Sequence, residues 1–169
     1  YWLGRMLQGG ADPRFVVRRM LRMASEDIGM ADPRALQQVA AAAQAVEHVG
    51  MPECELALAQ AAVYLCLAAK SNALYKAYGK VKREVAKRPG LAIPMAIRNA
   101  PTKLMKDVGY GEGYRYAHDE EGAVADLECL PDELAGTNFY HPTDYGWEAR
   151  IAERMKEIRK LRQGRKKRS

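Results

Sequence analysis

Two copies of the dipeptide Asp-Pro, at Asp12-Pro13 and Asp32-Pro33, divide the first third of the chain into helices. An aspartate before a helix accepts hydrogen bonds from the free amides of the first turn, and proline at the first helical position has its φ angle already set. Each pair therefore predicts a helix start. We expect one helix over residues 13–25 and a second over residues 33–49.

Glycine, proline and serine mark the ends of five further helices. The one expected over residues 52–69 is apolar on nearly every side, which predicts that it is central and buried. The last one carries the narrow apolar stripe Ile151, Met155, Ile158 and Leu161, which suits a helix docked on a groove or a partner. The predicted positions are the residues before Gly9-Gly10, residues 52–69, Ser71 to before Arg88, residues 101–108 and residues 143–162.

The chain becomes irregular after Pro89, because prolines and glycines recur too often for long helices. We expect turns and short pieces over residues 109–142, packed along the helices or functional. No segment alternates polar and apolar residues for long, so little or no sheet is expected. The predicted fold is mostly α: a helical bundle with a long irregular Gly/Pro-rich segment and a C-terminal helix.

Basic charge is concentrated at the C-terminal end. The chain has 27 Lys and Arg against 21 Asp and Glu, but residues 150–169 alone hold ten basic and two acidic residues. Residues 163–169 are predicted to form a disordered basic tail, which either binds nucleic acid by releasing counterions or only keeps the chain soluble. The candidate DNA contacts are Arg14, Arg18, Arg22, Arg159, Lys160, Arg162, Arg165, Lys166, Lys167 and Arg168.

The first three of these arginines follow one another at intervals of four residues, which places them on one helix face. A solvated face is the favoured interpretation, and contact with phosphates or an acidic partner is the alternative.

A glycine- and tyrosine-rich loop follows the short helix expected at residues 101–108. It lacks the lysine and hydroxyl of a P-loop and the spacing of a dinucleotide fingerprint, so no cofactor is predicted in this chain. We favour rings that anchor the loop on the helical body, with stacking on exposed nucleobases as the alternative. The candidate structural or interface loop comprises Gly109, Tyr110, Gly111, Gly113, Tyr114, Arg115 and Tyr116.

No catalytic or metal site is predicted. His118-Asp119 and His141 with Asp144 lack the spacing of metal ligands, and no nucleophile motif is present. Three widely spaced cysteines, at positions 54, 66 and 129, are expected to be small core residues in a reducing, cytoplasmic protein. No apolar run is long enough to span a membrane.

Four stretches together resemble one known family. They are residues 1–36, residues 56–78, "RNAPTKLMKDVGYGEGYRYAHD" at residues 98–119 and "LPDELAGTNFYHPTD" at residues 130–144. They are similar to the C-terminal region of the replication-associated recombination ATPases RarA/MgsA, whose eukaryotic relatives are the Werner-helicase-interacting proteins. The resemblance extends from Tyr1 to about Arg162.

The resemblance implies a clamp-loader-collar-like oligomerisation domain over residues 1–162, assembling an AAA+ ATPase as a homotetramer. It implies roles in DNA replication, recombination and repair at forks, binding to DNA junctions and to single-strand-binding protein, and a cytoplasmic, nucleoid-associated location. ATP and Mg²⁺ are expected in an upstream module, and this fragment is expected to have no enzymatic activity. A start at Tyr1-Trp2 agrees with a piece of a longer chain. The alternative function is a DNA-binding helical module that uses the basic tail and the arginine face.

Overall fold

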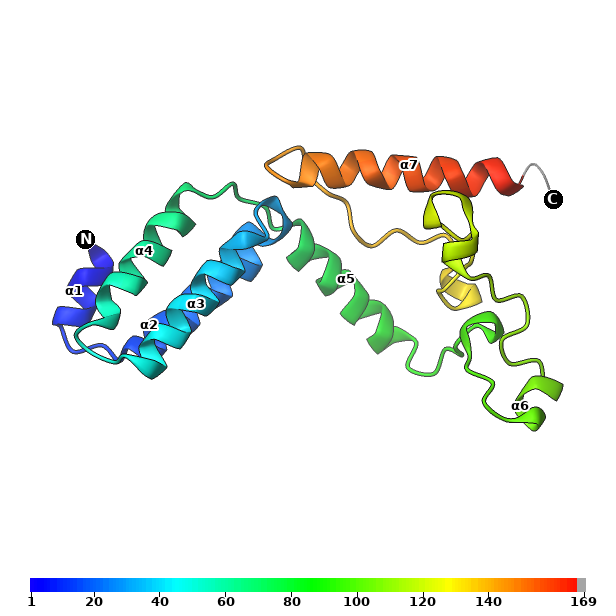
Figure 1. Ribbon diagram of the computed structural model, residues 1–169, viewed down its shortest axis with the longest axis horizontal. Helices are drawn as coiled ribbons and strands as arrows, with labels where there is room; N and C mark the ends of the chain where they lie inside the picture. The colour runs from blue at the N-terminus through cyan, green and yellow to red at the C-terminus, as the bar shows by residue number, and fades with distance from the viewer. Residues whose placement is uncertain (167–169) are drawn as a thin grey trace. The chain divides into compact units, whose positions relative to one another are not determined.

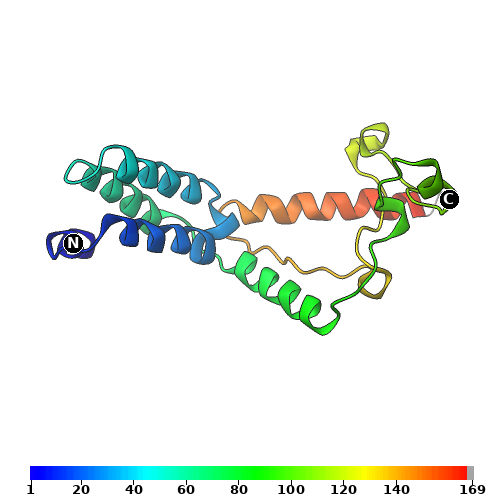
Figure 2. The same cartoon turned by 90° about the horizontal axis from the view of Figure 1, so that it is seen from below.

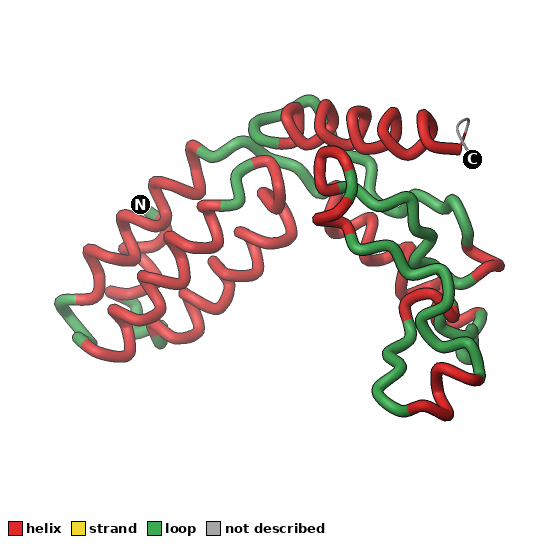
Figure 3. The backbone as a smooth tube through the Cα atoms, turned by 45° about the vertical axis from the view of Figure 1, so that its right-hand side comes forward, coloured by secondary structure: helices red, strands yellow, loops and turns green. Residues whose placement is uncertain are grey.

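A computed structural model describes the backbone of residues 1–166, and their side chains except those of Glu121 and residues 164–166. Over this range the chain forms seven α-helices joined by turns and loops, and Figure 3 shows no strand there. The prediction of a mostly α fold is confirmed. The chain divides into two compact units: unit 1 comprises Tyr1–Lys80 and Tyr140–Ala152, and unit 2 comprises Val81–Phe139 and the described residues from Glu153 onward.

Unit 1 is built on four helices: α1 (Trp2–Gln8), α2 (Pro13–Met23), α3 (Arg34–His48) and α4 (Cys54–Leu67). The last three lie side by side, and α3 contacts both α2 and α4 (Figures 1 and 2). Small residues on α3 and α4 let these helices approach closely. The core side chains include Leu7, Val16, Val17, Met20, Ile28, Ala35, Val39, Ala42, Val46, Cys54, Leu58, Ala61 and Leu65.

Both Asp-Pro pairs begin helices, as predicted. The Asp12 carboxylate accepts the Arg14 amide at 2.8 Å, and the Asp32 carboxylate accepts the Arg34 amide at 3.1 Å. The other oxygen of Asp32 accepts the hydroxyl of Tyr64 on α4 at 2.7 Å, which ties the start of α3 to α4. Burial alone would raise the pKa of Asp32, but the hydrogen bonds from Tyr64 and Arg34 outweigh it and lower that pKa.

Helix α4 is not the central buried helix that the sequence predicted. Its buried stripe, which contains Leu58 and Leu65, faces α3, while Leu56, Val63 and Leu67 on the other side are 79%, 60% and 82% exposed. The error has a physical reason, because all-round apolarity does not distinguish a helix buried within one chain from one that leaves a face unpartnered.

Helices α5 (Ala73–Lys87) and α7 (Glu148–Lys166) each begin in unit 1 and continue in unit 2. The Ser71 hydroxyl accepts the Ala73 amide at 3.2 Å, so the predicted serine cap of α5 is confirmed. The predicted start of α7 near Thr143 or Asp144 was wrong, because the helix begins at Glu148. Gly146 adopts a φ of 55°, and the Trp147 amide donates to the Ala31 carbonyl at 2.7 Å, which turns the chain before the helix begins.

The Glu148 carboxylate is fully buried in unit 1 and accepts four hydrogen bonds. One oxygen accepts the Ser71 hydroxyl at 2.7 Å and the amide and hydroxyl of Thr143 at 2.8 and 2.6 Å. The other accepts the Tyr140 hydroxyl at 2.7 Å. Because these donors come from residues 71 and 140–143, the carboxylate fastens the returning segment of unit 1 to the residues before α5.

Both acidic groups of this cluster have shifted pKa values. Burial alone would raise the pKa of Glu148, but the hydrogen bonds from Thr143, Tyr140 and Ser71 outweigh it and hold that pKa below 4.5. Burial, together with the hydrogen bond to the carboxylate, raises the pKa of Tyr140. Glu148 is therefore a stable anion at neutral pH without an adjacent lysine or arginine among its hydrogen-bond donors.

Unit 2 is mostly irregular, as predicted for residues 109–142. Its short helix α6 (Lys103–Asp107) is capped by the Thr102 hydroxyl, which accepts the Met105 amide at 3.3 Å. Downstream, the Glu128 carboxylate accepts the amides of Leu130 and Gly136, both at 3.0 Å, and closes a loop. The apolar stripe of α7 is half-buried, in agreement with a docked helix.

The C-terminal helix extends further than predicted, because its backbone continues to Lys166 rather than ending near Arg162. Residues 167–169 lie outside the described residues. The single domain over residues 1–162 and the disordered tail over residues 163–169 stay predictions.

We expect Glu148→Gln to destabilise the protein by about 2–3 kcal/mol at pH 7, because the amide nitrogen cannot accept the hydrogen bonds that a carboxylate accepts. A lowered pKa contributes stability above the unfolded-state value, near 4.5, and that stability is lost as the pH falls through the folded-state value. The difference between wild type and variant should therefore shrink below pH 4.5. Urea denaturation across this range measures it, with the exposed Glu53→Gln as control. A difference that stays constant with pH would contradict this role.

Gly146→Ala should cost roughly 2–4 kcal/mol, well above the ordinary penalty for alanine at positive φ. A Cβ atom at residue 146 would lie 2.2 Å from the Ala31 carbonyl oxygen and 2.9 Å from the Ala69 Cβ. Gly10→Ala is the matched control, because Gly10 also has a positive φ but an added Cβ meets nothing within 4 Å. Equal losses of stability in the two variants would contradict this prediction, because they would show that the backbone relieves the clash between the added Cβ and the Ala31 carbonyl oxygen at little cost.

Candidate functional site

The exposed side of α4 presents three large apolar side chains to solvent. Leu56, Val63 and Leu67 follow one another at helical spacing, with Gln60 and Cys66 also exposed beside them. Unpartnered apolar stripes of this kind are typical of protein interfaces. We call this set of residues the α4 stripe.

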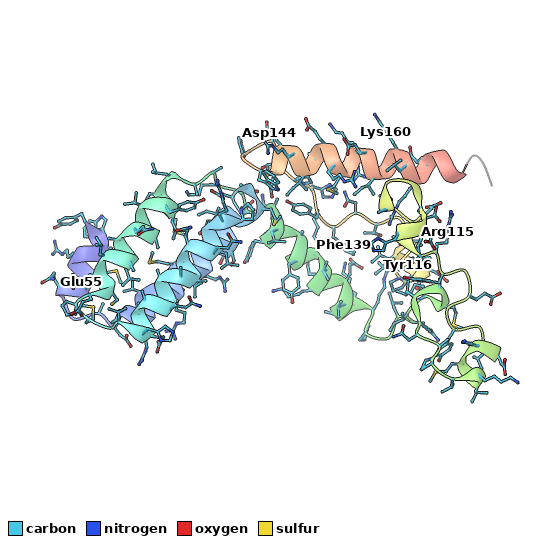
Figure 4. All side chains as sticks on the ribbon, viewed as in Figure 1. Glu55, Arg115, Tyr116, Phe139, Asp144 and Lys160 are labelled. Carbon is cyan, nitrogen blue, oxygen red and sulfur yellow. The ribbon has the colours of Figure 1, made fainter. Side chains whose placement is uncertain are left out.

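A shallow pocket of about 440 Å³ adjoins the α4 stripe where α1 meets α4. Leu3 and Leu7 of α1 and Leu56 of α4 supply its apolar walls. Glu53 and Glu55 also line it, and Figure 4 labels Glu55 beside α1. The α4 stripe is therefore continuous with an apolar hollow that has an acidic edge.

The arginine face of α2 is largely occupied by contacts within the chain. Arg14 forms a bidentate ion pair with Glu47, in which its Nε and Nη2 atoms donate to the two carboxylate oxygens at 2.8 and 3.0 Å. The carboxylate raises the pKa of Arg14. Arg22 pairs with Glu26, and the guanidinium of Arg18 lies 5.6 Å from the centre of the Phe15 ring. Two of these three arginines thus have their charge balanced by a carboxylate, which agrees with the favoured interpretation of a solvated face.

Basic residues near the end of α7 are differently placed. Arg159, Lys160 and Arg162 are exposed, and Figure 4 labels Lys160 on this helix. Arg162 also lies close enough to the Glu128 carboxylate to help lower its pKa, although backbone hydrogen bonds to Glu128 have the larger effect. Arg165 and Lys166 belong to α7, but their side chains are not described. Lys167 and Arg168 lie outside the described residues.

The glycine- and tyrosine-rich loop is a series of turns in unit 2. Gly109, Gly111 and Gly113 all have φ near +80° to +90°, a region that glycine enters without steric cost. The Gly109 amide donates to the Lys106 carbonyl at 2.9 Å, so Gly109 ends α6 as predicted. The Gly111 amide donates to the Met95 carbonyl at 2.9 Å and fixes the loop to the preceding segment.

The tyrosines of this loop differ in exposure. Tyr110 is partly buried, with the Arg98 guanidinium 5.2 Å from its ring centre, whereas Tyr114 and Tyr116 are 57% and 54% exposed. The Tyr116 ring lies 5.0 Å from the ring of His118, and Arg115 forms an ion pair with Glu120 at 2.7 Å. Figure 4 labels Arg115 and Tyr116 on this segment. Tyr110 is the more buried of the three, and both interpretations of Tyr114 and Tyr116 remain predictions.

A pocket of about 700 Å³ lies between the loop and the segment before α6. It is lined by backbone and side chains of residues 96–100, 106–107, 109–112 and 114, all within unit 2. We refer to it as the 96–114 pocket.

Other candidate groups give no site among the described residues. The histidines, cysteines and carboxylates there do not converge in any group of three that would hold a metal ion. Cys54 is buried as predicted, but Cys66 and Cys129 are exposed, so the prediction of core cysteines was wrong for two of the three. None of the described helices has both the length and the apolar character needed to cross a membrane.

Known proteins provide an independent comparison. A family model described as MgsA AAA+ ATPase C terminal matches residues 1–159. Replication-associated recombination protein A of Coxiella burnetii is 53% identical over 162 residues, which is 95% of this chain and 37% of that protein. The Escherichia coli K12 protein of the same name is 49% identical over 156 residues, covering 92% of this chain and 35% of the relative. ATPase WRNIP1 of Dictyostelium discoideum is 49% identical over 142 residues, which is 83% of this chain and 16% of that protein.

The chain thus spans little more than a third of the length of these bacterial relatives. The resemblance found in the sequence is confirmed over nearly the whole chain. The chain belongs to the family formed by the C-terminal region of the MgsA AAA+ ATPases.

Proposed function

We propose that this chain is the assembly domain of an AAA+ ATPase that acts in replication-associated recombination. Its relatives carry that role in their names, and the chain itself contains no P-loop. The observation that carries the assembly role is the α4 stripe. Its leucines at positions 56 and 67 are exposed to water, and covering them with a partner lowers the free energy of the system.

The magnitudes are sufficient for a second copy of the chain to be that partner. Burying one Leu or Val side chain is worth roughly 1.5–3 kcal/mol, and two copies facing each other through the α4 stripe bury six such side chains. Association costs on the order of 4–15 kcal/mol in lost freedom, so the stripe supplies a gain of the same size. The adjoining pocket between α1 and α4 adds further apolar area.

The remaining features of the proposal follow from family membership. A homotetramer is proposed, in which the α4 stripe joins copies in pairs and a second interface joins the pairs. ATP, Mg²⁺ and hydrolysis are assigned to an upstream ATPase module, and this fragment is proposed to have no enzymatic activity of its own. Proposed partners of the whole protein are DNA forks or junctions and single-strand-binding protein, in a cytoplasmic, nucleoid-associated setting.

We expect the double variant Leu56→Glu/Leu67→Glu to have a lower mass in light scattering than the unchanged chain at the same concentration, because the contact through the α4 stripe is lost. Two carboxylates in the α4 stripe would have to lose their hydration in the interface, while both positions are exposed enough to leave unit 1 folded.

Leu36→Glu on α3 is the matched control, because Leu36 is also an exposed leucine of unit 1 but lies outside the α4 stripe. It should keep the mass of the unchanged chain. The assembly proposal fails if the unchanged chain is a monomer at all concentrations. If the double variant keeps the full mass, the α4 stripe is not the interface.

A second candidate function, DNA binding through phosphates, is favoured by the exposed basic residues of α7. Arg159, Lys160 and Arg162 extend the basic run that ends the sequence, whereas Arg14 and Arg22 are already paired with carboxylates. The two functions are compatible, because the α4 stripe lies in unit 1 and these residues lie in unit 2.

Removal of residues 164–169 should weaken single-strand and forked-DNA binding and flatten its salt dependence. The log–log slope should fall by about 0.7–0.9 for each phosphate that the shortened chain no longer neutralises. Arg14→Ala/Arg22→Ala is the comparison variant and should change the slope little. Fluorescence anisotropy between low and moderate salt measures both. If truncation leaves the slope unchanged, or if the α2 variant shows the larger loss of affinity, the tail does not bind the DNA.

A further inference from the structure

The 96–114 pocket has the size and the wall chemistry of a binding site for a small, flat, polar group. Its volume of about 700 Å³ falls within the usual range for ligand pockets. Ala96, Ile97 and Ala100 supply an apolar part of the wall, while Asn99 and two tyrosines add polar and aromatic groups. From this combination we propose that the 96–114 pocket holds one unpaired nucleobase of a single DNA strand.

The aromatic wall is already arranged for stacking. The Arg98 side chain is held by a hydrogen bond from its Nε to the Ile93 carbonyl at 2.7 Å, and its guanidinium covers the Tyr110 ring. Tyr114 borders the same pocket with more than half of its surface exposed. A flat base gains contact with an exposed ring at little entropic cost when the surrounding groups are fixed in advance.

The polar wall suits the edge of a base better than a dense array of phosphates. The Asn99 amide offers both a donor and an acceptor, as base edges do. Lys106 offers a positive charge for the attached phosphate, and the two carboxylates of Asp107 and Glu112 balance the charges of Lys106 and Arg98 in the pocket wall. A duplex would bring two rows of phosphates toward these carboxylates, whereas a single strand can direct a base inward and keep its backbone beside Lys106.

The turn geometry keeps the pocket open. Gly111 is tied to Met95 by its amide, and Gly109 leaves room for the Glu112 carboxylate, which would lie 3.1 Å from a Cβ at residue 109. The inference uses only groups of unit 2 and does not depend on assembly through the α4 stripe. It rests on the proposed replication role only for the choice of DNA as the strand.

The test uses the 169-residue chain and a short, hairpin-free single strand that carries 2-aminopurine or 5-iododeoxyuridine. The unchanged chain should bind the single strand more tightly than the matching duplex. Tyr114→Ala should weaken binding of the single strand about tenfold and abolish the change in 2-aminopurine fluorescence.

Tyr114→Phe should bind the single strand as the unchanged chain does, because the ring and not the hydroxyl stacks. Lys106→Ala should lower the log–log salt slope by about 0.7.

Tyr75→Ala is the matched control, since Tyr75 is 52% exposed but lies in unit 1, and it should leave affinity unchanged. Ultraviolet crosslinking of the iodinated strand should label the peptide of residues 107–115, which carries Tyr110 and Tyr114. The proposal is overturned if the unchanged chain does not bind a single strand at low salt or if that peptide is not labelled. It is also overturned if the Tyr114→Ala variant is folded and keeps its affinity for the single strand. A variant that keeps this affinity but shows reduced assembly in light scattering counts against the proposal in the same way.

Discussion

One buried carboxylate holds the two sequence segments of unit 1 together. Glu148 lies at the start of α7, and its four hydrogen bonds come from neutral donors on two segments that are far apart in the sequence. A buried anion without these donors would carry a desolvation cost of several kcal/mol. The residues between Tyr140 and Glu148 are therefore held to one geometry, and the turn at Gly146 against Ala31 follows from the same docking.

Once this segment is fixed, the helices of unit 1 share a core made largely of alanine, valine and leucine. Such a core is thin, because α2, α3 and α4 lie in a row and only α3 contacts two of the others extensively. An outer helix in such a row keeps one face in water. When that face is apolar, as on α4, partner binding completes the burial that the chain does not achieve alone.

Much of the fold could be predicted from local signals. Asp12 and Asp32 cap helices, Ser71 caps α5, and Gly109 ends α6, because each effect depends on residues that are close in the sequence. The start of α7 and the exposure of α4 could not be predicted this way. In the sequence, Glu148 is indistinguishable from an ordinary surface glutamate. Its burial depends on hydrogen bonds from Ser71 and Tyr140, and these residues come close to it only in the tertiary fold. The arginine face on α2 was predicted correctly as a face, but Glu47, a partner 33 residues away, gave no local signal.

The discontinuity of unit 1 has a consequence for how the protein is made. Its first segment ends at Lys80 and its second begins at Tyr140, with the whole of Val81–Phe139 between them. During synthesis from the N-terminus, the first four helices, which supply the apolar core of unit 1, emerge from the ribosome well before residues 140–152. The Ser71 hydroxyl stays hydrated until Glu148, its hydrogen-bond acceptor, is translated more than seventy residues later. The nascent chain thus passes through a stage in which the helices that make the core of unit 1 have been synthesised but the returning segment that docks on them has not.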